Sequence, residues 1–293
     1  MEIPQTLPSH RSAPGITIPG YNLKRRLATG TFGSVFLATG LGDPQPIAVK
    51  VIRHDSHRDA NDLVRLMREH ELLSRLDGRH IVRVFERGFA EDFAYIAMEY
   101  CAHGDLWQRL QGRCVAPAQA IAILRQIGLG LAVAHGQHVI HRDLKPANVL
   151  LRNLNTVALA DFGAACDLGL SKMSIGQSKV VGTPAYASPE VIRCEEVDCR
   201  TDLYSAGIIL YQMVTGVLPY RAPSLAKIFK AHMQAPIPKL KGPPAVLQPV
   251  LDGLLAKDPN DRFQSAEELL AGLEWIAHQQ GWPFPPRDDG LIQ

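Results

Sequence analysis

The hydrophobic pattern of the chain changes once, near residue 100, and this change restricts the folds that the chain can adopt. One segment before that point, residues 59–76, carries leucines at three-to-four spacing with charges opposite, which predicts a helix. Around it lie short segments rich in β-branched and aromatic residues, which predict strands over residues 21–27, 34–38, 47–52, 82–88 and 93–98. We therefore expect one antiparallel sheet with a single main helix packed on it.

After residue 104 the apolar residues recur at helical spacing. This pattern predicts helices over residues 118–135, 200–215, 225–232, 247–256 and 266–276. A strand-rich part followed by a helix-rich part indicates an α+β fold with two lobes and a ligand-binding cleft between them. Within a domain over residues 21–278, we expect a first lobe over 21–98, a hinge over 99–104 and a second lobe over 105–278.

The two ends of the chain differ from this central part in composition. Residues 1–20 contain several prolines and no long apolar core, so they predict a flexible leader and neither a secretory signal nor a packed element. Residues 279–293 form a Pro-rich tail.

The composition excludes several classes of protein. A hydrophobic content of 46% with 20% charged residues is that of a globular domain, and a net charge of +2 argues against a dedicated binder of nucleic acid or membrane surfaces. No apolar run reaches the roughly 20 residues of a membrane-spanning helix. The 5 cysteines are odd in number and scattered, and Cys194 and Cys199 have no second Cys/His pair nearby, so a disulfide framework and a zinc site are both disfavoured. We expect a cytoplasmic protein, or the cytoplasmic part of a longer membrane-anchored one.

The segment His141–Asn148, followed by Asp161-Phe162-Gly163, contains the residue types that phosphoryl transfer requires. That reaction needs a carboxylate near the attacking hydroxyl, oxygen ligands for a metal ion on the phosphates, and a cation near the departing charge. Asp143 can supply the carboxylate, Asn148 and Asp161 the metal ligands, and Lys145 the cation. Each residue alone could be a solvated turn residue, but the ordered set favours the chemical interpretation.

Two features of the strand-rich part fit the same chemistry. Leu27–Val35 forms a turn between predicted strands, and its Gly30 and Gly33 would let backbone N–H groups approach phosphates. A plain hairpin is the alternative, because Ala28 leaves only these two glycines in the turn. Lys50 lies in an apolar run, so it must reach either solvent or an anion.

With these motifs in this order over residues 21–276, the chain resembles the eukaryotic-like (Hanks-type) protein kinases, and among them the bacterial serine/threonine kinases. The resemblance implies that Lys50 contacts the α- and β-phosphates of ATP and pairs with Glu69, with Glu71 as the rival partner. Glu69 is preferred because Leu73 lies one helical turn further on the same face, where it can pack in the core.

The resemblance also assigns an ATP pocket, with Met98–Cys101 as the hinge that pairs with adenine. Asp105 would accept a ribose hydroxyl or pair with a basic substrate side chain, or it could simply cap the following helix. The residues expected to bind ATP are Leu27, Gly30, Gly33, Val35, Ala48, Lys50, Met98, Glu99, Cys101, Asp105 and Leu150.

The resemblance gives each residue of the central motif a role. Asp143 would orient the incoming hydroxyl and take its proton, while Lys145 would offset charge on the phosphoryl group and indicates serine/threonine specificity. Asn148 and Asp161 would hold Mg²⁺, with Mn²⁺ as an alternative ion. The expected catalytic residues are Asp143, Lys145, Lys50 and Glu69.

Further motifs resemble the parts that support catalysis in this family. Gly182–Glu190 resembles the substrate-docking segment, and Glu190 is expected to pair with Arg262. Asp202 is expected to brace the catalytic loop through backbone N–H groups.

The segment before the docking motif suggests regulation by phosphorylation. Ser178 is the favoured site, and Arg142 and Arg65 are the cations that a phosphate could pair with. The alternative is that these serines are ordinary polar loop residues. The expected regulatory residues are Arg142, Arg65, Ser171, Ser174, Ser178 and Thr183.

The resemblance implies a serine/threonine protein kinase that uses ATP and phosphorylates protein substrates, itself in trans included, without contacting nucleic acid or membrane. A pseudokinase that serves as a scaffold is the main alternative, and small-molecule phosphotransferases are disfavoured by the docking segment. Residues 218–227 resemble, more weakly, kinases associated with type VI secretion.

Overall fold

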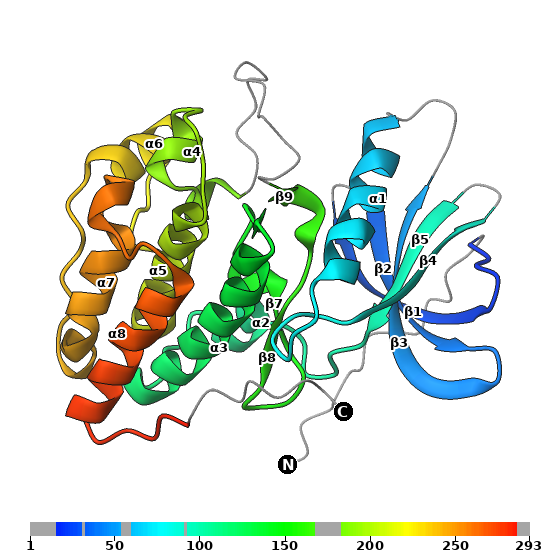
Figure 1. The fold of residues 1–293 in the computed structure, drawn as a ribbon, viewed down its shortest axis with the longest axis horizontal. Helices are drawn as coiled ribbons and strands as arrows, with labels where there is room; N and C mark the ends of the chain where they lie inside the picture. Colours follow the sequence, from blue (N-terminus) through cyan, green and yellow to red (C-terminus); the bar gives the residue numbers. More distant parts are fainter. Residues whose placement is uncertain (1–15, 31–32, 54–59, 91–92, 168–182, 286–293) are drawn as a thin grey trace, which may run out of the picture. The chain divides into compact units, whose positions relative to one another are not determined.

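The computed structural model describes residues 16–30, 33–53, 60–90, 93–167 and 183–285 (Figure 1). The chain groups into two compact units, the first made of Met1–Glu71 and Arg83–Tyr100 and the second of Leu72–Val82 and Cys101–Gln293. The boundary after Tyr100 lies where the hydrophobic pattern changes. Residues 72–82, which the sequence assigned to the first lobe, group instead with the second unit.

The first unit contains one antiparallel sheet of five strands, as the sequence predicted. Its spatial order is β1-β2-β3-β5-β4, so β3 and β5 lie inside the sheet. The strands are β1 (Tyr21–Gly30), β2 (Gly33–Gly40), β3 (Asp43–Arg53), β4 (Val84–Ala90) and β5 (Phe93–Glu99). On β3, Lys50 lies opposite Val35 of β2 and Ile96 of β5, which places its backbone in the middle of the sheet.

Helix α1 (Ala60–Arg75) is the one long helix predicted for this part of the chain. Leu66, Leu72 and Leu73 are buried, as expected from their three-to-four spacing. The boundary between the two units falls within this helix, after Glu71.

The sheet has a hydrophobic core that reaches into the residues before β1. Ile18 is 2% exposed and packs with the buried side chains of Phe36, Val49 and Tyr95. The prediction of a flexible leader was therefore wrong for residues 16–20, because burying an isoleucine is worth about 1.5–3 kcal/mol and fixes this segment on the sheet. Residues 1–15 lie outside the described residues.

The second unit is mainly helical, which confirms the predicted α+β architecture (Figure 1). Helix α3 packs against α5 and α8, and α5 packs against α7. The helices are α2 (Leu106–Leu110), α3 (Pro117–Gly136), α4 (Pro189–Ile192), α5 (Arg200–Thr215), α6 (Leu225–Gln234), α7 (Gln248–Leu255) and α8 (Ala266–Gln279). The sequence predicted the five longer ones, whereas α2 and α4 are too short to show a helical period.

One helix of the described chain, α3, is long and apolar enough to pass as a membrane span by length and composition alone. Its most apolar window is 56% buried, and the helix packs on two others, as the core helix of a folded domain does. The chain beyond α8 also contacts it, since Arg125 donates to the Pro285 carbonyl at 2.9 Å and lies over the Phe284 ring.

Two short antiparallel strand pairs frame the segments that carry the predicted chemistry. Strand β6 (Val139–Ile140) pairs with β9 (Cys166–Asp167), and β7 (Val149–Leu151) pairs with β8 (Val157–Leu159). Residues 141–148 therefore connect β6 to β7, and residues 160–165 connect β8 to β9. The cysteines whose state is described are free, namely Cys101, Cys114, Cys194 and Cys199.

Candidate active site

The predicted pair of Lys50 and Glu69 is formed within the first unit. Lys50 Nζ lies 2.6 Å from Glu69 Oε2, and Glu69 is 2% exposed. A carboxylate buried to this degree needs a cation or several hydrogen bonds, and Lys50 provides the cation. Glu71, the rival partner, is exposed. The pairing is confirmed, while the contact of Lys50 with phosphate stays a prediction.

The glycines of the predicted phosphate loop end β1 and begin β2. Gly30 pairs with Gly33 across the hairpin, and Thr31 and Phe32 between them lie outside the described residues. Gly33 has φ of +149°, and a Cβ at this position would collide with the Val51 carbonyl. A side chain here would therefore disturb both the turn and β3.

The residues expected around adenine fall into two groups, one in each unit. In the first unit, Ala48 and Met98 face each other across β3 and β5 and are buried. The same unit holds the half-buried Leu27 and Val35, and Glu99 at the end of β5. In the second unit, Cys101 is buried and Asp105 forms a bridge with Leu150.

Asp105 has a clear structural role that the sequence had left open. Its side chain accepts a hydrogen bond from Gln108 N at 2.8 Å and caps the first turn of α2. Burial raises the pKa of Asp105. The capping interpretation is confirmed, and the contact with ribose remains a prediction.

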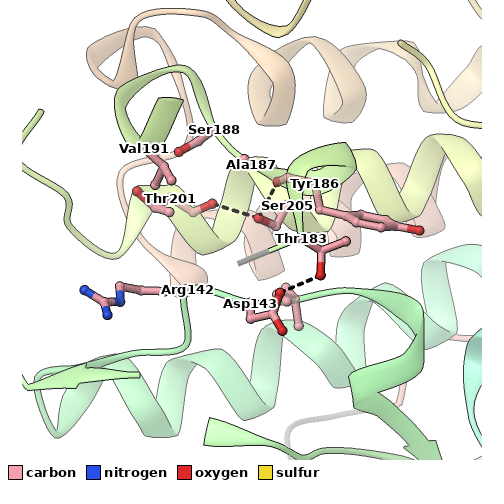
Figure 2. A pocket seen from close by; sticks show the side chains of 10 residues that line it. Arg142, Asp143, Thr183, Tyr186, Ala187, Ser188, Val191, Thr201 and Ser205 are labelled. Atoms are coloured by element: carbon pink, nitrogen blue, oxygen red, sulfur yellow. Dashed lines mark hydrogen bonds between the residues drawn. The ribbon is translucent and has the colours of Figure 1, made fainter. Parts of the chain in front are cut away.

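The catalytic loop and the docking segment bring three predicted residues into direct contact, and Figure 2 shows the contact between Asp143 and Thr183. Lys145 Nζ donates to Asp143 Oδ2 at 2.6 Å and to Thr183 Oγ1 at 2.9 Å, and Thr183 Oγ1 donates to Asp143 Oδ1 at 2.8 Å. Each oxygen of Asp143 thus accepts a hydrogen bond. The contacts among Lys145, Asp143 and Thr183 join the catalytic loop to the predicted docking segment, since Thr183 follows Asp143 by 40 residues.

The arrangement of Asn148 and Asp161 fits a metal ion bound together with phosphates. Asn148 Nδ2 donates to the Asp143 carbonyl at 2.8 Å, which leaves the side-chain oxygen available as a ligand. Ala160 N donates to the Asn148 carbonyl at 2.9 Å and so holds the residue before Asp161 beside Asn148. Within the described residues no cluster of three or more His, Cys, Asp or Glu could hold a metal alone. Two oxygen-bearing side chains completed by phosphate oxygens are typical of Mg²⁺ sites.

Asp202, at the start of α5, braces the catalytic loop as predicted. Its oxygens accept hydrogen bonds from His141 N and Arg142 N, each at 2.9 Å, and Oδ2 also lies 2.9 Å from His135 Nε2. Burial alone would raise the pKa of Asp202, but the hydrogen bond and charge of His135, with those from His141, hold it below its usual value. The bonds fix Arg142 at φ of +62°, a conformation that side chains rarely adopt.

The docking segment is tied to the helical core by a second buried carboxylate. Arg262 donates to both oxygens of Glu190 at 2.8 Å, and Thr201 donates to Glu190 Oε1 at 2.8 Å. Burial opposes ionisation of Glu190, yet the Arg262 guanidinium holds its pKa below the usual value. The predicted ion pair is confirmed. A bidentate pair of this kind fixes both position and orientation.

A small pocket lies between the catalytic loop and the docking segment (Figure 2). Ser205 donates to the Tyr186 carbonyl at 2.9 Å, and the Tyr186 hydroxyl donates to Gln212 at 2.8 Å. The structural roles of Ser205, Gln212 and His135 were not predicted from the sequence, because nothing local marks a polar residue within α3 or α5 as a partner of a distant loop. The contact of Thr183 with Asp143 was not predicted either.

The regulatory predictions are not tested by the described residues. Ser171, Ser174 and Ser178 lie outside them, as does the side chain of Arg65. Arg142 is described, and its Nε donates to the Ala164 carbonyl at 2.7 Å.

Comparison with known proteins gives the same picture as the geometry. Residues 21–275 match the family model of the protein kinase domain. The chain is 35% identical to serine/threonine-protein kinase PknJ of Mycobacterium tuberculosis over 291 residues, which cover 95% of this chain and 49% of that protein. It is 35% identical to serine/threonine-protein kinase pkn3 of Myxococcus xanthus, over 87% of this chain and 50% of that protein.

A third relative, serine/threonine-protein kinase PknB of Mycobacterium tuberculosis, is 36% identical over 92% of this chain and 44% of its own length. The chain thus spans about half the length of these relatives. Their names make no reference to type VI secretion, so that prediction gains no support. The family model, the relatives and the geometry agree that this chain belongs to the protein kinase domain family, on the branch of the bacterial serine/threonine kinases.

Proposed function

We propose that the chain transfers the γ-phosphoryl group of ATP to serine and threonine hydroxyls of proteins, its own chain included. The observation that carries this proposal is the contact of Asp143 with Lys145 and Thr183, beside Asn148 and Asp161. The chemistry consumes ATP, which fits the cytoplasm.

Asp143 acts on the substrate hydroxyl in this proposal. Asp143 Oδ1 already accepts a hydrogen bond from one hydroxyl, that of Thr183, and the substrate hydroxyl would be oriented by the same carboxylate. As the hydroxyl oxygen forms its bond to the γ-phosphorus, the bond to the β,γ-bridging oxygen breaks, ADP leaves, and Asp143 takes the hydroxyl proton. Lys145 offsets the negative charge near the reacting oxygens.

Lys50, Asn148 and Asp161 act on the nucleotide. Lys50 would contact the α- and β-phosphates, and Glu69 would hold its ammonium group in place. Asn148 and Asp161 would hold Mg²⁺, or Mn²⁺, which neutralises phosphate charge when bound. Gly30 and Gly33 would close over the phosphates, and the residues around Met98 and Leu150 would hold adenine.

Transfer of labelled phosphate tests the proposal. The protein is incubated with γ-labelled ATP, Mg²⁺ and a set of peptides that contain serine, threonine or tyrosine, and Asp143→Asn serves as the matched control. We expect the parent, and not the control, to label the peptides that contain serine or threonine. Label on the chain itself is then mapped, with Ser171, Ser174, Ser178 and Thr183 as the expected positions. A parent that binds ATP but transfers no phosphate would contradict the proposal and indicate a scaffold. Ala28, in place of a third loop glycine, is the sequence feature that supports this alternative.

A further inference from the structure

The acidic residues of this chain are unevenly distributed. The chain contains 29 Asp and Glu among 293 residues, about one in ten, yet none between residues 203 and 251. The same stretch contains the cations Arg221, Lys227, Lys230, Lys239 and Lys241. A stretch with one sign of charge creates a local potential that the net charge of +2 does not reveal.

Three of these cations gather at helix α6. Lys227 and Lys230 lie three positions apart and are exposed, and Arg221 is exposed in the loop before the helix. The inner side of α6 buries His232, whose Nδ1 is hydrogen-bonded to the Tyr204 hydroxyl of α5 at 2.9 Å. The helix is therefore held in place while its cations face solvent.

Within the described residues these three cations have no carboxylate partner. Lys239, further along the same stretch, differs because it lies 3.2 Å from Asp252. We call the surface made by Arg221, Lys227 and Lys230 the α6 face.

The α6 face adjoins the part of the second unit that would receive a substrate. Helix α6 packs against α4 and against the short helical turn Pro184–Tyr186, and Figure 1 shows α4 and α6 next to each other. Thr183, which precedes that turn, donates to Asp143. The helix that carries these cations is therefore in direct contact with the docking segment.

Several carboxylates of the surrounding elements are neutralised by pairing: Asp143 with Lys145, Glu190 with Arg262, and the exposed Glu195 with Arg193. Glu196, Asp258 and Asp261 are exposed and form no ion pair within the described residues. Helix α6 itself carries two lysines and no carboxylate.

We propose that the α6 face docks an acidic segment of the protein substrates of this kinase. The inference rests on the proposed function and names its substrate class. A protein segment fits better than nucleic acid or a lipid surface because α6 packs against the turn that follows Thr183, and Thr183 contacts Asp143, the residue proposed to act on a peptide hydroxyl. Docking on the α6 face would lower KM for substrates with an acidic segment and leave the rate of the chemical step unchanged.

The test uses paired peptides that share one serine acceptor and differ in a following segment of either glutamates or glutamines. For the parent at low salt, we expect kcat/KM to be about tenfold higher with the acidic peptide than with the glutamine peptide, because KM is lower. This preference should vanish at about 0.5 M salt. In Lys227→Ala/Lys230→Ala the two peptides should react equally, while activity on the glutamine peptide should match that of the parent. The control Lys24→Ala/Arg26→Ala removes the same charge from exposed positions of β1 and should keep the preference.

Binding of the labelled acidic peptide, measured by fluorescence anisotropy without ATP, separates the two proposals. If the parent phosphorylates both peptides equally and binds neither preferentially, the docking inference is wrong and the kinase function stands. If it binds the acidic peptide through Lys227 and Lys230 but transfers no phosphate, the kinase function is wrong and the docking inference stands. Phosphatidylglycerol vesicles and single-stranded RNA are tested in parallel, and tighter binding of either than of the acidic peptide would overturn the inference.

Discussion

At the scale of single residues, Asp143 illustrates how a carboxylate is held in one orientation. Lys145 donates to one of its oxygens at 2.6 Å and Thr183 to the other at 2.8 Å, so the carboxylate cannot rotate freely. Hydrogen bonds to an ionised acceptor are stronger than those between neutral groups. Removing the negative charge should therefore affect the reaction far more than the fold.

Replacing Asp143 by asparagine should lower turnover by about 10²- to 10⁴-fold, because the variant keeps the shape of the site but loses the proton acceptor. ATP affinity should stay close to that of the parent. Replacing Asp161 by asparagine should instead weaken productive binding of Mg²⁺-ATP. Steady-state kinetics and a nucleotide-binding assay on both variants check this, and equal, minor losses of turnover in both would reject the catalytic assignment.

Lys50 and Glu69 should behave as one unit, because the 2.6 Å contact holds the lysine and neither residue retains its function alone. In a double-mutant cycle with Lys50→Met and Glu69→Gln, each single change should lower kcat/KM by roughly 10²-fold, and the double variant should be little worse than either. Glu71→Gln is the matched control, with an expected activity close to that of the parent. Simple additivity of the two losses would show that the contact does not serve the reaction.

At the scale of elements, helices of the second unit carry buried groups that hold loops in place. His232 of α6 is 0% exposed, and its Nδ1 is hydrogen-bonded to the Tyr204 hydroxyl of α5. Burial, followed by the charge of Lys257, lowers its pKa from 6.5 to about 4. Neutral His232 is therefore part of how α6 is attached to α5.

This attachment predicts a pH dependence of stability. Between pH 6.5 and 4 the unfolded chain protonates His232 but the folded chain does not, so the free energy of unfolding falls as pH decreases. The loss that His232 contributes between pH 7 and 5 should be about 2 kcal/mol. Urea unfolding of the parent and of His232→Asn between pH 7 and 5 measures this contribution. It equals the difference between the two proteins in how their free energy of unfolding changes with pH. The asparagine amide can still form a hydrogen bond with Tyr204. The same dependence in both proteins would assign the effect to other groups.

The elements also show what the sequence can and cannot predict. Strands and long helices were predicted because their hydrophobic period is local, and helix α5 begins and ends where the spacing indicated, at Arg200 and Thr215. The Glu190–Arg262 and Lys50–Glu69 pairs followed from the family resemblance. Ile18 was missed because a single apolar residue after prolines has no period. The contact of Thr183 with Asp143 was missed because it depends on how two distant loops fold together.

At the scale of the whole molecule, the family model of the protein kinase domain covers residues 21–275, and Lys50, Asp143, Asn148 and Asp161 all lie in that range. Two of them, Lys50 and Asp143, belong to different compact units. Binding of ATP to the native state alone should stabilise the folded chain, because it shifts the unfolding equilibrium.

Addition of Mg²⁺-ATP should therefore raise the midpoint of thermal unfolding. A nucleotide concentration about a hundredfold above Kd adds about 2.7 kcal/mol, which corresponds to a shift of roughly 5–10 °C for a domain of this size. Chelation of the metal with EDTA, or the Asp161→Asn change, should remove most of this shift. Differential scanning fluorimetry checks it, and an equal shift with and without metal would contradict the role given to Asn148 and Asp161.

The buried carboxylate of Asp202 has a consequence for hydrogen exchange. Because Asp202 is 0% exposed and accepts from the amides of both His141 and Arg142, these amides cannot reach solvent unless a buried carboxylate loses two of its hydrogen bonds. Loops usually open at little free-energy cost, but this one should open only when α5 itself opens. In native-state exchange followed by NMR, the His141 and Arg142 amides should exchange as slowly as those in the centre of α5, and Asp202→Asn should accelerate the loop amides alone.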